Sequence, residues 1–194
     1  MAKQERALRT REGVLDAAAE EFSAHGYAHT TMQAVAARTG MTKGALYGHF
    51  PTKDDLADEL VRHGEAVWDE LNGQADAAGT GPVTVLRALV LGLAGSMSSD
   101  TRVRAAFRLS RDRTAAGHPG GELLGSVHRN FASRILSAQG AGEVGRHHPP
   151  ESAARLLLAI VMAQQSVPLA IGDQIHSTWP EFAWSMAAAA LTEH

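Results

Sequence analysis

The chain has 194 residues, which is enough for one large domain or two modest ones. Its hydrophobic fraction of 44% and charged fraction of 20% are those of a globular protein, and its apolar runs are too short to predict a membrane span. The lack of cysteine excludes disulfides, thiol catalysis and cysteine-ligated zinc; together with a charged N-terminus that has no apolar signal region, it predicts a cytoplasmic protein.

The charges are distributed unevenly along the chain. The formal net charge is -3, but residues 1–53 carry seven Lys or Arg and five Asp or Glu, whereas the remainder carries eleven and sixteen. A mildly basic N-terminal module on an acidic body is compatible with nucleic-acid binding. A charged tail that is merely solvated would give the same balance.

Helical spacing dominates the first part of the chain. Residues 8–25 carry apolar side chains at helical intervals, and Gly26 follows them as a stop signal. A short helix comes next, which Thr31 can begin as N-cap and Gly40 can close in the left-handed conformation that glycine tolerates. Thr42 is the candidate N-cap of another short helix directly after it.

A long helix is predicted over about 53–78, because Thr52 and Asp55 stand at the spacing of a capping box. Residues 75–82 have the composition of a linker, rich in glycine and small residues. Later helices are predicted over about 83–98, 100–113, 120–139, 150–167 and 176–192. No segment alternates convincingly with period two, so we predict an all-α protein of about nine helices.

The two short helices are joined by the stretch RTGMT, with glycine at the turn, which is the layout of a helix-turn-helix. The donors that its second helix offers to phosphates and base edges are Thr42, Lys43, Tyr47 and His49. Gly44 and Gly48 have no side chain and would let the backbone approach the DNA groove closely. Ala45, Leu46 and Phe50 are predicted to face the supporting helices. A plain turn between two helices, without a DNA role, is the alternative.

The stretch TTMQAVAARTGMTKGALYGHFPTKDDL resembles the TetR family of bacterial transcriptional regulators, and the likeness runs over residues 8–60. The residues that match the family pattern are Phe22, Gly26, Tyr27, Thr30, Thr31, Val35, Ala36, Gly40, Met41, Lys43, Gly44, Leu46, Tyr47, His49, Phe50 and Lys53. By position, the resemblance implies phosphate contacts from Thr31, Tyr47, His49 and Lys53, and it places Thr42, Lys43 and Gly44 where the recognition helix meets the bases. Arg6, Arg9 and Arg11 are similar to the basic N-terminal arms of some members, although a solvated tail would look the same.

The resemblance divides the chain into a helix-turn-helix DNA-binding domain over residues 1–52 and a helical regulatory and dimerisation domain over 53–194. The sequence supports the second domain independently, because ESAARLLLAIVMAQQSVPLAI is apolar nearly all round and the last helix carries a wide apolar stripe. Pairing the last two helices with those of a second copy would bury this surface, and packing within one chain is the alternative. The expected partners are therefore palindromic operator DNA, a small-molecule effector and a second copy, with no membrane.

The segments MTKGALYGHFPTKDDLADEL and VRAAFRLSRD look like the γ-butyrolactone receptor branch of that family, whose members repress genes until a small lactone or related signal binds. Val127 stands where that branch commonly has a tryptophan in its pocket. The ligand is therefore a butyrolactone, another small apolar molecule or none, as in an orphan regulator that binds DNA without a ligand. Further pocket candidates, for which plain core is the alternative, are Leu93, Met97, Phe107, Phe131, Met162, Gln165, Ser166 and Trp184.

The remaining arrangements of charged and polar residues predict no chemistry. Arg104, Arg108 and Arg111 share one helical face, which we expect to be solvated. Without cysteine, and with no HExxH spacing among the histidines, neither a metal site nor a cofactor is predicted. No nucleophile and base stand together, so we predict a regulator and not an enzyme; an enzyme that uses the apolar cavity is the alternative from another class.

Overall fold

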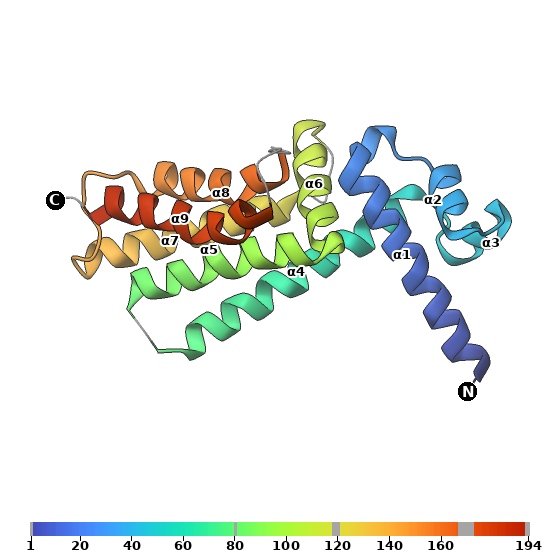
Figure 1. Cartoon of the computed structure of the whole chain (residues 1–194), viewed down its shortest axis with the longest axis horizontal. Coiled ribbons are helices and arrows are strands. Elements are labelled where there is room, and N and C mark those ends of the chain that lie inside the picture. Colours follow the sequence, from blue (N-terminus) through green and yellow to red (C-terminus); the bar gives the residue numbers. More distant parts are fainter. Residues whose placement is uncertain (1, 80, 118–120, 167–172, 193–194) are drawn as a thin grey trace. The chain divides into compact units, whose positions relative to one another are not determined.

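The computed structural model describes residues 2–79, 81–117, 121–166 and 173–192, and the side chains of residues 4–79, 81–117, 121–163 and 180–191. The described part of the chain consists of helices and connecting turns (Figure 1). These helices are α1 (Ala2–His29), α2 (Met32–Thr39), α3 (Lys43–His49), α4 (Lys53–Ala77), α5 (Pro82–Ser99), α6 (Thr101–Ala115), α7 (Glu122–Gly140), α8 (Pro150–Ser166) and α9 (Asp173–Thr192). The prediction of an all-α protein of about nine helices is confirmed, with boundaries that differ by a few residues.

The helices pack into two compact units. Unit 1 comprises Met1–Val67 and Asp100–Leu124, and unit 2 comprises Trp68–Ser99 and Gly125–His194. Unit 1 therefore contains α1 to α3, the first part of α4, and α6, which comes from much later in the chain. The functional boundary predicted between residues 52 and 53 stays a prediction.

The two short helices of the helix-turn-helix are each bounded by capping hydrogen bonds between residues close in the sequence. Thr31 begins α2, and its side-chain oxygen accepts a hydrogen bond from the backbone N–H of Ala34 at 3.1 Å. Gly40 ends α2 in the left-handed conformation with φ of 67°, which a residue with a Cβ rarely adopts. Thr42 begins α3 in the same way as Thr31, accepting from the N–H of Ala45 at 3.3 Å. All three predicted caps are confirmed.

The capping box at the start of α4 is also confirmed. The backbone N–H of Thr52 donates to Asp55 Oδ2 at 2.9 Å, and the N–H of Asp55 donates back to Thr52 Oγ1 at 3.0 Å. This reciprocal pair satisfies two donors that a helix start leaves without partners. α4 then runs to Ala77, one residue short of its predicted end.

The first helix kinks at its predicted stop. Gly26 has the non-helical angles φ 73° and ψ 177°, yet α1 continues for one more turn to His29. The carbonyl oxygen of Gly26 accepts hydrogen bonds from the N–H and the hydroxyl of Thr30, which hold this turn together. The regular helix therefore ends at the glycine, as predicted, and one helical turn follows across the kink. α1 also starts earlier than predicted, at Ala2.

Unit 1 has its own core under the short helices. Phe22 of α1 and Leu46 of α3 are completely buried, and Phe50 closes the end of α3 with only 3% of its surface exposed. The prediction that Ala45 faces the supporting helices is wrong, because this side chain is exposed. α3 has only seven residues, and Leu46 is on the side of it that is buried.

In unit 2, α5 supplies much of the core, with Leu86, Leu89 and Leu93 completely buried. By length and composition alone, Pro82–Ser99 would be long and apolar enough to cross a membrane, with a mean hydropathy of 1.3. The buried positions of its leucines are those of a core helix in a globular protein, which passes the same test. α8 and α9 both pack against α5.

Candidate nucleic-acid interface

The start of α3 presents polar groups to solvent while its inner face holds the helix in place. Thr42, Lys43 and Gly44 are exposed, and Tyr47 is 39% exposed. The Lys43 ammonium lies 5.8 Å from the centroid of the Tyr47 ring, so the two polar side chains share one side of the helix. Leu46, completely buried, anchors the opposite side. The arrangement brings a cation, two hydroxyls and bare backbone onto one accessible surface, as contact with a polyanion requires.

The two N-cap threonines keep a free donor. The side chains of Thr31 and Thr42 each accept a hydrogen bond from a backbone N–H with their oxygen, so the hydroxyl proton remains available. Both residues are exposed, and His49, at the end of α3, is half-buried. Contacts of Thr31 and His49 with DNA phosphates, and of Thr42 with the bases, stay predictions.

Lys53, the first residue of α4, is tied to the end of α1. Its ammonium donates to the carbonyl oxygen of Tyr27 at 2.9 Å and to that of Thr30 at 3.2 Å. The same ammonium lies 4.1 Å from the centroid of the Tyr27 ring, within range of a cation–π interaction. An ammonium has three donors, so one remains for a phosphate. The predicted phosphate contact and this structural role are compatible.

Tyr27 gathers charged groups around its ring, a role that the sequence did not reveal. Its hydroxyl donates to Asp54 Oδ1 at 2.7 Å, and the Arg113 guanidinium lies 5.7 Å from its ring centroid. The ring stacks parallel to that of Phe22, with centroids 6.2 Å apart. Burial, and then the hydrogen bond to Asp54, raise the pKa of Tyr27 to about 12. The residue is therefore a neutral donor at physiological pH.

α6 holds α1 through charged side chains. Arg102 donates to Glu12 Oε2 at 2.6 Å and to Asp16 Oδ1 at 2.7 Å. One turn and a half later, Arg108 donates to the carbonyl oxygen of Ser23 at 2.6 Å. The expectation of a solvated arginine face is wrong for Arg108, which is half-buried with its Nε completely covered, because α6 packs along α1.

Further along α6, Asp112 and Arg113 complete this attachment. Asp112 Oδ2 accepts from the backbone N–H of Tyr27 at 3.1 Å, directly after the kink at Gly26. A Cβ on Gly26 would come within 2.6 Å of the same oxygen, so a glycine is needed for this close approach. Arg113 is only 5% exposed and donates to Asp58 Oδ1 at 2.6 Å. α6 thus fixes both the end of α1 and the start of α4 within unit 1.

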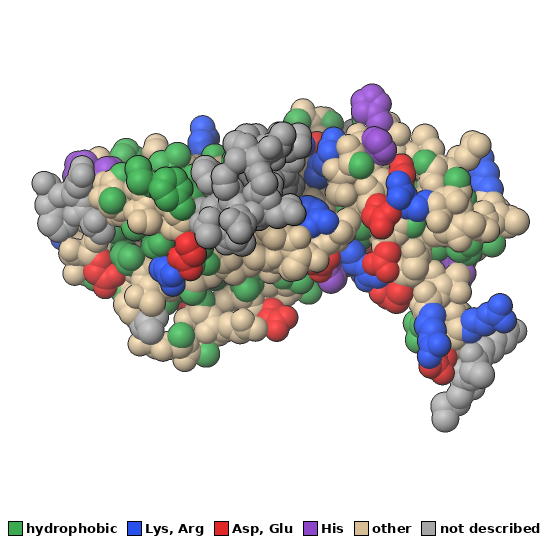
Figure 2. All heavy atoms as spheres, viewed as in Figure 1, with side chains coloured by type: hydrophobic (Ala, Val, Ile, Leu, Met, Phe, Trp, Pro, Cys, Tyr) green, Lys and Arg blue, Asp and Glu red, His purple; other side chains and the backbone are tan. Residues whose placement is uncertain are grey.

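Arg11 is less available for DNA than the resemblance to a basic arm implies. Its guanidinium pairs with Glu59 at 2.9 Å and lies 4.8 Å from the centroid of the Phe50 ring. The hydrogen bond with Glu59 raises the pKa of Arg11, and the same bond holds the pKa of Glu59 below its usual value. Arg6 and Arg9 are exposed. On the face shown in Figure 2, basic side chains near α1 are interspersed with acidic ones.

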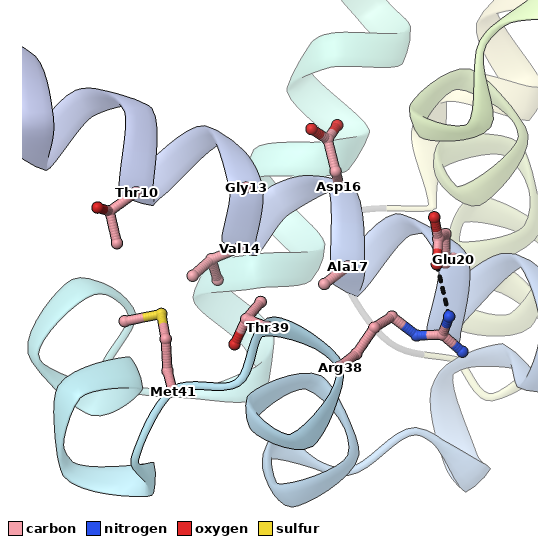
Figure 3. A pocket seen from close by; sticks show the side chains of 9 residues that line it. All are labelled: Thr10, Gly13, Val14, Asp16, Ala17, Glu20, Arg38, Thr39 and Met41. Carbon is pink, nitrogen blue, oxygen red and sulfur yellow. Dashed lines mark hydrogen bonds and ion pairs between the residues drawn. The ribbon is translucent and has the colours of Figure 1, made fainter.

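A cleft of about 570 Å³ lies between α1 and the turn that joins α2 to α3 (Figure 3). Its lining residues are Thr10, Gly13, Val14, Asp16, Ala17, Glu20, Arg38, Thr39 and Met41. Across it, Arg38 pairs with Glu20 at 2.6 Å and with Glu21 at 2.7 Å. These ion pairs join α2 to α1.

The predicted ligand-pocket residues lie in different parts of the structure. Leu93, Met97, Val127, Phe131 and Trp184 are buried in unit 2, and Met162 is half-buried there. Phe107 is completely buried in unit 1. The side chains of Gln165 and Ser166 lie outside the described residues. Trp68, which the sequence did not single out, meets Phe131 edge to face, with ring centroids 5.8 Å apart.

Comparisons with known proteins identify relatives over both units. The sequence model of a family described as bacterial regulatory proteins, tetR family, matches residues 14–60. The A-factor receptor protein of Streptomyces griseus is 29% identical over 205 aligned residues, which cover 100% of this chain and 70% of that protein. The predicted resemblance to the TetR family, and within it to the γ-butyrolactone receptor branch, is confirmed.

Solved structures agree with these sequence matches. A γ-butyrolactone receptor described as an ArpA-like protein superposes with a TM-score of 0.71 at 25% identity, covering 95% of this chain and 99% of that chain. The ketosteroid transcriptional regulator KstR2 of Mycobacterium tuberculosis superposes with a TM-score of 0.82 at 16% identity, covering 95% of each chain. At that low identity the second likeness shows the fold alone.

Proposed function

Because the chain belongs to the TetR family of DNA-binding transcriptional regulators, we propose that it is a homodimeric repressor of palindromic operators that a small, largely apolar ligand releases. The observation that carries the DNA-binding part is the exposed surface of α3. Lys43, Gly44 and Tyr47 share it, and the buried Leu46 holds it rigid. The proposed DNA contacts are Thr31, Thr42, Lys43, Gly44, Tyr47, His49 and Lys53.

Exposed apolar side chains on the last two helices support the dimer. Leu156 of α8 is 54% exposed, and Phe182 and Met186 of α9 are 58% and 61% exposed. Large apolar groups on neighbouring helices mark an interaction surface, and a two-fold pairing of α8 and α9 would cover them. Such a dimer would present two α3 helices to successive major grooves, about 34–36 Å apart.

The effector is proposed from the relatives. The A-factor receptor and the γ-butyrolactone receptors are named for small ligands, and this chain aligns with the former over its whole length. The proposed apolar effector site lies in unit 2 and is lined by Leu93, Met97, Val127, Phe131, Met162 and Trp184. Gln165 and Ser166, which the sequence also predicts, have side chains outside the described residues. A γ-butyrolactone or a related signal is the first ligand to test. Phe107 belongs to unit 1 and is not included.

Release would follow from a small change in α4. This helix supplies residues to both units, up to Val67 in unit 1 and from Trp68 in unit 2. A ligand that binds one tilt of α4 better than another shifts the protein toward that tilt, and a difference in affinity of a few kcal/mol is sufficient. The two α3 helices would then no longer match the spacing of the grooves. All of this takes place in the cytoplasm, where the operator DNA lies.

The experiment that tests the proposed function is affinity selection of sheared genomic DNA on the purified chain, repeated at several salt concentrations. We expect an enriched palindrome whose affinity falls steeply with salt, because each phosphate contact releases counterions. Addition of candidate lactones or cell extracts should then release the selected DNA. A folded, dimeric protein that enriches no site would overturn the proposal.

A ligand-independent regulator is the second candidate. Val127, completely buried, stands where the γ-butyrolactone receptor branch has a tryptophan, so a stacking partner for a lactone ring is missing at that position. Equal operator affinity with and without every candidate ligand and extract would favour this second function over the first.

A further inference from the structure

A short chain of hydrogen bonds in unit 2 runs from α4 to α7 and ends at a buried oxygen atom. Asn72 Nδ2 donates to the carbonyl oxygen of Trp68 at 2.8 Å, and Asn130 Nδ2 donates to Asn72 Oδ1 at 2.9 Å. Asn130 Oδ1 is buried, and no donor among the described residues forms a hydrogen bond with it. The last acceptor of this hydrogen-bond network is therefore left unsatisfied.

The orientation of both amides follows from the network itself. The carbonyl oxygen of Trp68 can only accept, so Asn72 must turn its Nδ2 toward Trp68 and its Oδ1 toward Asn130. Asn130 must then offer Nδ2 to Asn72, because two oxygen atoms would otherwise face each other. Rotating either amide by 180° breaks a bond without supplying a donor to the free oxygen. The unsatisfied atom is thus Asn130 Oδ1.

The two helices that carry this pair of amides also bring apolar side chains together. Trp68 and Phe131 meet edge to face within the same pair of helices, and both side chains are buried. One turn further along α4 and α7, Arg134 pairs with Asp76 at 2.7 Å. Asn130 also follows Val127 by three residues on α7, so the two residues lie close on the helix surface. On α7, Asn130 is therefore a near neighbour of residues assigned to the effector site.

A buried acceptor without a donor lowers the stability of a folded protein, because it has lost its water and gained no partner. We infer that Asn130 Oδ1 accepts a hydrogen bond from a hydroxyl or N–H group of the effector. The effector is then an apolar molecule that carries a hydrogen-bond donor. This inference rests on the proposed function, since it names one contact within the effector site of unit 2. A site of this kind rejects analogues that lack the donor.

The test compares alcohols with their methyl ethers, which keep the oxygen and lack the O–H. Cyclohexanol, octanol and phenol, each paired with its methyl ether, are titrated into the full-length chain, and dissociation constants are measured by nuclear magnetic resonance. We expect at least one alcohol to bind about tenfold more tightly than its ether, as one hydrogen bond to a buried acceptor predicts. Equal affinities within every pair, or binding of no alcohol at all, would overturn the inference.

Variants test whether the preference for alcohols over ethers depends on Asn130 Oδ1. Asn130→Leu removes the acceptor at similar volume, so the ratio of alcohol to ether affinity should fall to about one. The double variant Asn72→Leu/Asn130→Leu serves the same purpose without leaving Asn72 unpaired, in case the single variant does not fold. Gln74→Leu is the matched control, because it removes an exposed amide of α4 that donates to Glu70 and leaves the pair of Asn72 and Asn130 in place. Discrimination that persists in the Asn130→Leu variants, or that disappears in the control, would contradict the assignment.

The failure of this inference differs from the failure of the proposed function. Binding to the selected operator is measured on the same protein without any probe. Operator binding with no discrimination between alcohol and ether overturns only the contact at Asn130. Discrimination that depends on Asn130, in a protein that binds no DNA, overturns the repressor and leaves the contact standing.

Discussion

The ammonium of Lys53 lies over the ring of Tyr27, 4.1 Å from its centroid, and donates to the carbonyl oxygen of the same residue at 2.9 Å. The first residue of α4 therefore caps the last turn of α1. Since Thr31 follows directly after that turn, this bond helps to set the position of the helix-turn-helix. Lys43, by contrast, has its ammonium near Tyr47 on an exposed surface.

These two lysines should respond differently to the same substitution. Lys43→Gln should reduce the slope of log affinity against log salt by about 0.9 and leave the free energy of unfolding unchanged, because it removes one phosphate contact only. Lys53→Gln should reduce the slope similarly and also lower the free energy of unfolding by about 1–3 kcal/mol, because it breaks hydrogen bonds to a charged group. Operator titrations at several salt concentrations and urea unfolding measure both quantities. An unchanged slope in Lys53→Gln would assign Lys53 to positioning alone.

A substitution at Gly44 should raise the stability of the protein and lower its affinity for DNA. A Cβ at this position meets nothing within 4 Å, so Gly44→Ala should raise the free energy of unfolding by about 0.5–1 kcal/mol through helix propensity. The added methyl group would keep the backbone from the groove, and operator affinity should fall by about tenfold. Gly13→Ala is the matched control, since Gly13 is also helical with open space around its Cβ. The control should gain stability at unchanged affinity; an equal loss of affinity in both variants would contradict the proposed contact.

The raised pKa of Tyr27 makes stability fall at alkaline pH. Because its pKa is about 12 in the folded protein and about 10 in the unfolded chain, the folded state holds the proton longer, and the contribution is complete below pH ~10. It is lost as the pH rises from ~10 to ~12. The chain has two tyrosines, so Tyr47→Phe leaves Tyr27 as the single phenol to follow by absorbance.

The matching variant for that measurement is Tyr27→Phe, which keeps the ring under Lys53 and loses the hydroxyl bound to Asp54. The free energy of unfolding should fall less between pH ~10 and ~12 in Tyr27→Phe than in Tyr47→Phe. Identical pH profiles of the two variants would show that Tyr27 is not the group responsible.

The proposed dimer can be tested with two leucines of similar exposure. Leu156→Glu places a charge on α8, and the protein should become monomeric in sedimentation and lose at least about tenfold in operator affinity. Leu136 of α7 is 62% exposed but lies outside the last two helices, so Leu136→Glu should remain dimeric. A dimer that dissociates in the Leu136 variant and persists in the Leu156 variant would place the interface elsewhere.

Local chemistry determined much of the fold before any tertiary contact was known. The caps at Thr31, Gly40 and Thr42, and the capping box of Thr52 and Asp55, involve partners within four residues of one another. Their geometry follows from the backbone alone, so the sequence was sufficient to predict them. The exposed donors of α3 could also be predicted from the local sequence. Once Leu46 faces the core, the helical period places Lys43 and Tyr47 on an exposed side.

Only the tertiary structure decided the contacts between distant segments. Arg113 is buried and donates to Asp58, and the half-buried Arg108 donates to Ser23. These pairs are separated by 55 and 85 residues and form because α6 packs along α1 and reaches the first part of α4 within unit 1. The sequence shows Arg108 only as part of a polar helix face, for which solvent is the usual environment. The unsatisfied oxygen of Asn130 likewise depends on Asn72, 58 residues away. Hydrogen bonds of this kind depend on which helices meet, and that is determined by burial of the whole core and not by the residues beside them in the chain.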